Sequence, residues 1–163
     1  MSIKNKLISF CKSFYFAGCG IINCIKNERN MRFHFCAAFY VILFMRFYDL
    51  TGAEKAVVYL TIGLVISLEL VNTAIEALTD KISPEKSSLA KLAKDSAAGA
   101  VLIAAAASVA VAVCIFWDTA VFDRIYRYFS DNLLMLLLLI LSAIVWFFII
   151  FLPDGNKKGK QDV

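Results

Sequence analysis

Long apolar runs constrain this chain more than any other feature. Hydrophobic residues make up 61% of its 163 residues, above the roughly 45–50% that is usual in soluble domains. Four apolar segments can be drawn, and the last three reach the roughly 20 residues that a bilayer core requires. They are Phe33–Phe47, Ala56–Leu78, Ser96–Trp117 and Leu133–Leu152. The chain is therefore predicted to be an all-α membrane protein with four spans.

The segments outside these runs have their own patterns. In Met1–Ile25, lysines interleave with large apolar side chains at helical spacing, which favours an amphipathic helix on the membrane surface. Asp118–Asp131 is polar and is expected to be an external connection with a short interfacial helix. Between the second and third runs, Ser83 and Pro84 predict a helix start.

Basic residues predict the orientation of the spans. They gather before the first run and between the second and third, and the other connections hold few. By the positive-inside rule, the N-terminus and the central loop are therefore cytoplasmic, and four spans return the C-terminal tail to that side. Topology and anionic headgroups account for the net charge of +4, and no basic and aromatic nucleic-acid module is visible.

The second run carries polar groups that a membrane helix rarely contains. Glu69, Asn72 and Glu76 fall within about 60° of one another on a helix, and Asp80 continues the same stripe. A carboxylate near the bilayer centre costs about 2.5 to 3.5 kcal/mol on insertion scales. The stripe therefore predicts an active site in or near the membrane, with a polar network between helices as the structural alternative.

Two more polar clusters are expected at the same boundary of the membrane. Asn27–Asn30 precedes the first run, and Lys94 and Asp95 open the third. Carboxylates suit Mg²⁺, which commonly binds one or two of them together with substrate phosphates. A lysine supplies a point charge for a phosphoryl group. Together they suggest phosphoryl transfer, although no Walker A loop or kinase glycine loop is present.

Several strings of residues, in this order and spacing, resemble the bacterial diacylglycerol kinase and undecaprenol kinase family. They are Asn27–His34, Glu69–Glu76 with Asp80, Ser83–Glu85 and Leu92–Ala100. The resemblance covers about Phe10–Trp117. It implies a homotrimeric lipid kinase of the bacterial inner (plasma) membrane, with one surface helix and three membrane spans in each subunit. Its site would use magnesium and ATP at the cytoplasmic interface.

The resemblance also implies roles for single residues. Glu69 would be the catalytic base on the lipid hydroxyl, and Asn72 a polar residue of the active site. Glu28 and Glu76 would bind the metal. Contacts to ATP would come from Lys12, Phe16, Glu28, Glu76, Glu85, Lys86, Ser87, Lys94 and Asp95, although some relatives have an aromatic hydroxyl at the position of Phe16.

On this reading, residues 1–117 form the lipid kinase core, and residues 118–163 add a fourth span and a polar tail whose role the resemblance does not imply. The form of Glu28–His34 resembles the undecaprenol kinases of Gram-positive bacteria, so undecaprenol is the first hypothesis for the acceptor. Diacylglycerol, giving phosphatidic acid, is the alternative within the family. A small cation-coupled transporter and a non-enzymatic assembly partner are alternatives from other classes.

Overall fold

The protein is all-helical in the part of the chain that the structure describes. The computed structural model describes residues 3–82 and 87–153, which form six α-helices and no strand. The helices are α1 (Ile3–Asn27), α2 (Arg29–Met45), α3 (Gly52–Ile82), α4 (Ser88–Phe116), α5 (Thr119–Asp131) and α6 (Leu133–Ile150). The all-α fold class predicted from the sequence is confirmed.

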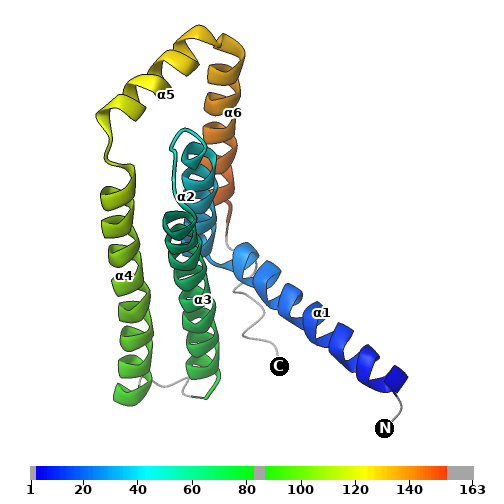
Figure 1. Ribbon diagram of the computed structural model, residues 1–163. Helices are drawn as coiled ribbons and strands as arrows, with labels where there is room; N and C mark the ends of the chain where they lie inside the picture. The colour runs from blue at the N-terminus through cyan, green and yellow to red at the C-terminus, as the bar shows by residue number, and fades with distance from the viewer. Residues whose placement is uncertain (1–2, 83–86, 154–163) are drawn as a thin grey trace.

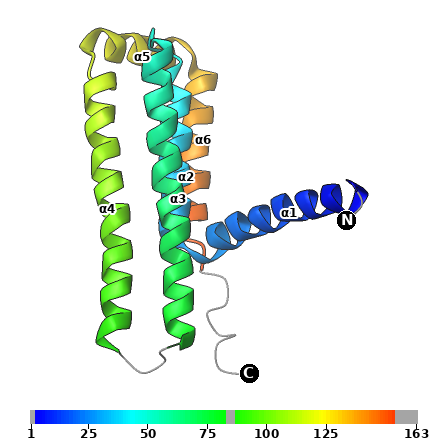
Figure 2. The ribbon, with the colours of Figure 1, turned by 60° about the horizontal axis from the view of Figure 1, so that its bottom comes forward.

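Four of the helices form a bundle. Helices α2, α3, α4 and α6 run along one another, α5 crosses one end, and α1 leaves the bundle at an angle (Figure 1). Helix α3 packs against both α2 and α4, whereas α6 packs against α2. The junction of α1 and α2, the C-termini of α3 and α6 and the N-terminus of α4 all lie toward the end opposite α5 (Figure 2). The first and third connections of the bundle are therefore on opposite sides from the central one, as the distribution of basic residues predicts.

Length and composition alone would assign the four membrane spans differently from the sequence prediction above. Helices α3, α4, α6 and residues Leu7–Asn27 of α1 are long and apolar enough to cross a membrane, whereas α2 has only 17 residues. However, α2 lies between α3 and α6, and α1 projects away from them, as a surface helix would. Helix α2 also begins four residues before the predicted run, because its first turn includes the polar residues Arg29, Asn30 and Arg32.

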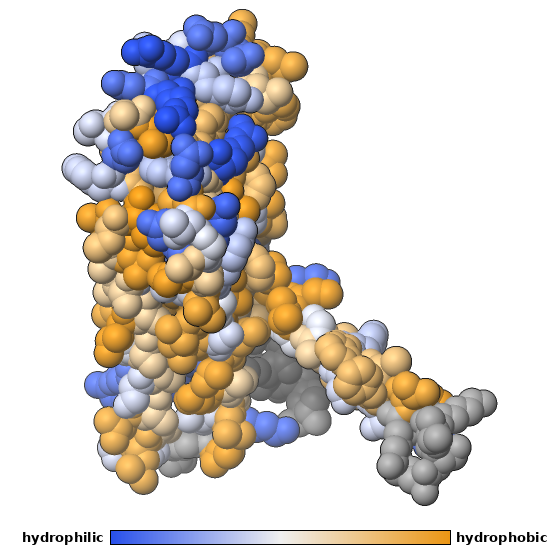
Figure 3. Space-filling model, viewed as in Figure 1, coloured by the Kyte–Doolittle hydropathy of each residue, from blue (hydrophilic) through white to orange (hydrophobic). Residues whose placement is uncertain are grey.

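The bundle shows apolar side chains to its surroundings. Figure 3 shows hydrophobic colour along the bundle and hydrophilic colour gathered at the end where α5 lies. Helix α6 contributes no buried residue, which suits a helix that faces lipid. The small side chains of Ala97, Val101 and Ala104 are buried, and α4 packs extensively on α3. Small residues let two membrane helices approach closely, so this packing is what the composition of the third run favours.

Helix α5 is the short helix predicted within Asp118–Asp131. Its N-cap is Asp118, whose carboxylate accepts hydrogen bonds from the backbone N–H of Ala120 at 2.9 Å and of Val121 at 3.3 Å. An aspartate at this position satisfies amide groups that have no partner within the helix. The helix start predicted at Ser83 and Pro84 lies outside the described residues, and α4 begins at Ser88.

Candidate active site

The most deeply buried charged group in the acidic stripe is Glu69. Its side chain on α3 is only 2% exposed, and the neighbouring Asn72 is 7% exposed. Burying a carboxylate is costly unless other groups hydrogen-bond to it. The side chain of Asn30, at the start of α2, provides such a hydrogen bond. The two helices that meet at this point therefore share one polar contact inside an apolar bundle.

Asn72 links the stripe together. Its Nδ2 donates a hydrogen bond to Oε1 of Glu76 at 3.0 Å, as expected for residues four apart on one helix face. Its Oδ1 is buried and has no hydrogen-bond partner among the described residues. A buried acceptor without a partner is uncommon, so this oxygen is available to a metal ion or to a hydrogen-bond donor on a substrate.

The junction of α1 and α2 brings a third carboxylate to the stripe. Glu28 is the N-cap residue of α2, with extended backbone and no capping hydrogen bond from its side chain. One turn earlier, Sγ of Cys24 lies 3.1 Å from Oγ1 of Thr73 on α3. The Thr73 hydroxyl in turn donates to the backbone oxygen of Glu69 at 3.0 Å. This chain of contacts fixes the end of α1 against α3.

The electrostatic contacts show how closely the acids gather. The Glu69 carboxylate lies within electrostatic range of both Glu28 and Glu76, and the buried Cys24 thiol lies within range of all three carboxylates. Like charges that crowd together favour the binding of a cation between them. The predicted clustering of the three acids is therefore present within a single chain.

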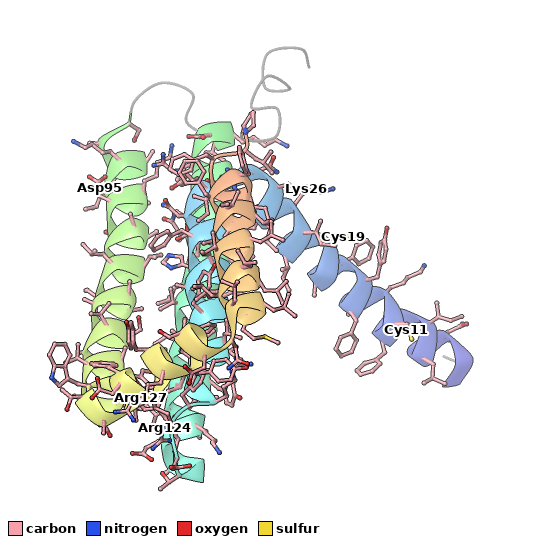
Figure 4. All side chains as sticks on the ribbon, turned by 90° about the horizontal axis from the view of Figure 1, so that it is seen from above. Cys11, Cys19, Lys26, Asp95, Arg124 and Arg127 are labelled. Atoms are coloured by element: carbon pink, nitrogen blue, oxygen red, sulfur yellow. The ribbon has the colours of Figure 1, made fainter. Side chains whose placement is uncertain are left out.

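Lys94 lies at the same end of the bundle but at the edge of this cluster. Its ammonium group forms an ion pair with Asp80, which joins the ends of α3 and α4. Asp80 follows Glu76 by four residues, or about 6 Å along the helix axis. Asp95 is exposed near the start of α4 (Figure 4). The ion pair of Lys94 with Asp80 therefore lies about one helical turn beyond Glu76.

The other residues predicted to contact ATP are not gathered at this point. Lys12 and Phe16 are exposed and lie on the stretch of α1 that projects from the bundle, between Cys11 and Cys19 in Figure 4. Ser87 is the N-cap residue of α4 and makes no capping hydrogen bond through its side chain. The remaining two, Glu85 and Lys86, lie outside the described residues.

The carboxylates fit a metal that is shared with a substrate. Among the described residues, no group of three or more His, Cys, Asp or Glu side chains is arranged to hold a metal ion by itself. Mg²⁺, however, usually keeps water and phosphate ligands and takes only one or two carboxylates. Glu28, Glu76 and the unpartnered Oδ1 of Asn72 form an all-oxygen donor set of that kind.

Two contributors were not singled out from the sequence. Asn30 belongs to the polar run before the first apolar segment, but nothing in the run distinguishes it from Asn27. Arg32 is 3% exposed, although its position next to an apolar run predicts a side chain at the membrane surface. The only signal for Arg32 is its spacing from Glu28, since it lies about one helical turn later, and Asn30 has no such signal.

Comparison with known proteins agrees with the geometry. The family model for prokaryotic diacylglycerol kinase matches residues 15–116, more than half of the chain. The chain belongs to the prokaryotic diacylglycerol kinase family. It is therefore a lipid kinase, with ATP as co-substrate and a lipid as acceptor. The match ends where α4 ends, so α5 and α6 lie outside the part that the family model describes.

Two similar proteins carry different acceptor names. The undecaprenol kinase of Bacillus subtilis is 43% identical over 113 residues, which cover 69% of this chain and 92% of that protein. The diacylglycerol kinase of Synechocystis is 41% identical over 104 residues, which cover 63% of this chain and 59% of that protein. Both alignments support the lipid kinase family, and they leave the acceptor to be argued separately.

Proposed function

We propose that this lipid kinase transfers the γ-phosphate of ATP to the hydroxyl of undecaprenol, at the cytoplasmic face of the bacterial plasma membrane. The observation that carries the choice is the similarity to an undecaprenol kinase over nearly the whole length of that relative. Diacylglycerol is the second candidate, because a relative of similar identity carries that name. Carboxylates clustered at one end of the bundle give no support to a cation path across it.

In this proposal Glu69 is the catalytic base. Its carboxylate is buried in α3 next to Asn30, on the membrane side of Asn72, Glu76 and Asp80. A lipid hydroxyl that enters from the bilayer meets Glu69 first. Glu69 accepts the hydroxyl proton while the oxygen attacks the γ-phosphorus in line and the bond to the β-phosphate oxygen breaks.

Glu28 and Glu76 are proposed to hold Mg²⁺ together with the phosphates of ATP. Glu28 lies at the junction of α1 and α2, and Glu76 lies on α3. Asn72 adds an oxygen that has no hydrogen-bond partner among the described residues. When bound, the ion would neutralise phosphate charge that these acids alone would repel. Asn72 also keeps Glu76 oriented through its hydrogen bond.

The remaining polar residues are proposed to bind the nucleotide. Lys94 would exchange its ion pair with Asp80 for the terminal phosphates. Asp95 follows it in α4, and Ser87 is the N-cap residue of that helix, about two turns before Lys94. Glu85 and Lys86, which precede Ser87 in the sequence, complete the proposed set on this side.

Lys12 and Phe16 require a second subunit in this proposal. They lie on the projecting part of α1, away from the acidic cluster of their own chain. In the homotrimer that we propose, the α1 helix of one subunit would reach the site of a neighbour. Support comes from the direction of α1, which leaves the bundle at an angle instead of folding back over its own acidic cluster (Figure 1).

The acceptor can be tested with purified enzyme in lipid. Radiolabelled ATP is supplied with undecaprenol, shorter polyprenols or diacylglycerol, and the labelled lipids are separated. We expect kcat/KM for undecaprenol to exceed that for diacylglycerol by at least about tenfold, a difference of roughly 1.4 kcal/mol in transition-state binding. A preference for diacylglycerol would replace the proposed acceptor and leave the lipid kinase assignment intact.

A further inference from the structure

Helices α5 and α6, which follow the family match, are attached to α2 along its whole length. Near the end of α2, the Phe129 ring contacts Phe44 and Phe47 with centroid separations of 6.2 Å. Halfway along, the hydroxyl groups of Tyr40 and Ser142 are 3.0 Å apart. Helix α6 also has few contacts with the bundle other than those to α2. The extension is therefore positioned to act on α2.

At the start of α2, Arg32 forms the third attachment. Nη1 of Arg32 donates to the backbone oxygens of Ile25 at 3.2 Å and of Lys26 at 3.1 Å. Nη2 donates to the backbone oxygens of Ile150 at 3.3 Å and of Leu152 at 3.0 Å. One side chain, 3% exposed, therefore binds the C-terminal ends of both α1 and α6.

Elementary helix chemistry explains this arrangement. The last carbonyl groups of a helix have no partner within it and carry partial negative charge. A guanidinium group has several N–H donors in a fixed plane, so it can serve two helix ends at once. Breaking a buried charge away from its partners is strongly destabilising. The ends of α6 and α1 are thus joined through the Arg32 guanidinium group, which has hydrogen-bond partners at both ends.

The hydrogen bonds of Arg32 lie next to the proposed metal site. The backbone N–H of Arg32 donates to the backbone oxygen of Glu28 at 3.3 Å, and the backbone N–H of Glu28 donates to that of Cys24 at 2.8 Å. Asn30, which contacts Glu69, is part of the same turn. Any movement of Arg32 relative to α1 would therefore change the positions of Glu28 and Asn30 relative to α3.

We propose that the α5–α6 extension is a positioning element for the active site, acting through Arg32. By docking on α2 and supplying two carbonyl groups to Arg32, it fixes the bend between α1 and α2 that holds Glu28 and Asn30 against the acidic stripe. The catalytic consequence rests on the proposed role of Glu28 in metal binding, whereas the docking itself does not.

The docking is tested without reference to activity. Spin labels are attached at positions 26 and 151 of the full chain, at the ends of α1 and α6, in a background that keeps the buried Cys24 and lacks the other native cysteines. The parent protein should give a narrow distribution of distances between the labels, and Arg32→Gln should broaden it. Arg124→Gln is the matched control, because Arg124 also donates to a backbone oxygen, that of Phe47 at 3.1 Å, but at the opposite end of the bundle (Figure 4).

The effect on the site is tested by titrating Mg²⁺ at saturating ATP. Groups that orient metal ligands typically contribute 10- to 100-fold to metal affinity or activity, so Arg32→Gln should raise the half-saturating Mg²⁺ concentration about tenfold. Arg32→Lys should recover only part of that loss, since an ammonium group cannot serve four carbonyls. A purely structural defect would lower the active fraction and leave the half-saturating concentration unchanged.

Trp146→Ala tests the same docking of α6 on α2 if the Arg32 variants do not fold. The Trp146 ring contacts Phe39 at 5.9 Å between centroids, so its removal loosens α6 while Arg32 remains. It should broaden the distances and raise the Mg²⁺ requirement in the same direction. Unchanged distances in every folded variant would overturn the docking role, and broadened distances with an unchanged Mg²⁺ titration would overturn the positioning role. Absence of kinase activity in the parent protein would instead count against the proposed function.

Discussion

At the scale of single residues, Glu69 differs from the other acids in its surroundings. It is buried on α3 together with the uncharged Asn72, whereas Glu28 lies at a bend between two helices and Glu76 lies closer to the end of α3. A buried carboxylate without a cation of its own is poorly suited to hold a nucleotide but well placed to take a proton. The different roles that we propose for the three acids follow this difference in burial.

Replacing Glu69 with glutamine tests the proton acceptor. Glutamine keeps the shape of the side chain and can still pair with Asn30, but it cannot accept a proton at neutral pH. We expect kcat to fall by about 10²- to 10⁴-fold, as is usual when a general base is removed, while the oligomer remains intact. The checks are lipid phosphorylation and size-exclusion chromatography, and a rate close to that of the parent would refute the assignment.

Replacing Glu76 with glutamine tests the metal ligand. The amide keeps a hydrogen-bonding side chain next to Asn72 but loses the charge that attracts a divalent ion. The half-saturating Mg²⁺ concentration should rise by about tenfold or more. Glu54→Gln is the matched control, because Glu54 lies on the same helix at the opposite end, where it accepts hydrogen bonds from Thr51. Equal titrations for the two variants would remove Glu76 from the metal site.

At the scale of helices, sequence periodicity predicted which polar residues share a face of α3. It did not predict the contacts at the bend between α1 and α2. The stripe from Glu69 to Asp80 follows from 3.6 residues per turn, so its shared face needs no knowledge of neighbours. The contact between Asn30 and Glu69, and the burial of Arg32, depend on how two helix ends fold against α3 and α6. Such tertiary contacts follow no sequence period, so the pattern of apolar residues could not predict them.

The cap of α5 gives a prediction for one helix. Asp118→Ala removes the carboxylate that accepts from the N–H groups of Ala120 and Val121. The loss should be about 1 kcal/mol, seen as a lower Tm in thermal unfolding in detergent. Asp118→Asn is the control, since asparagine caps helices about as well as aspartate and should keep most of the stability. Equal Tm values for Asp118→Ala and the parent would mean that the cap contributes nothing to the folded state.

At the scale of the whole molecule, the three acids lie near one another in a single chain, and most of α1 projects away from the bundle (Figure 1). Among the described residues, the hydrogen bonds that join α1 to the bundle lie near its last turns, at Cys24 and at the carbonyls bound by Arg32. The large apolar side chains on the rest of it, such as Phe10 and Phe14, are exposed. A helix of this kind is stable on a membrane surface, and there it can extend toward a neighbouring subunit.

This geometry predicts that two defective subunits can restore each other. If α1 of one subunit serves the acidic cluster of the next, Lys12→Glu and Glu69→Gln damage different subunits of one shared site. Mixed oligomers then contain some sites with an intact Lys12 from one chain and an intact Glu69 from the other. We expect co-purified mixtures to exceed the summed activity of the two separate variants. Glu69→Gln mixed with Glu76→Gln is the control, because both residues lie on α3 and every site built on either chain stays defective. Isolated mixed oligomers no more active than that control would mean that α1 serves its own chain or makes no contact with ATP.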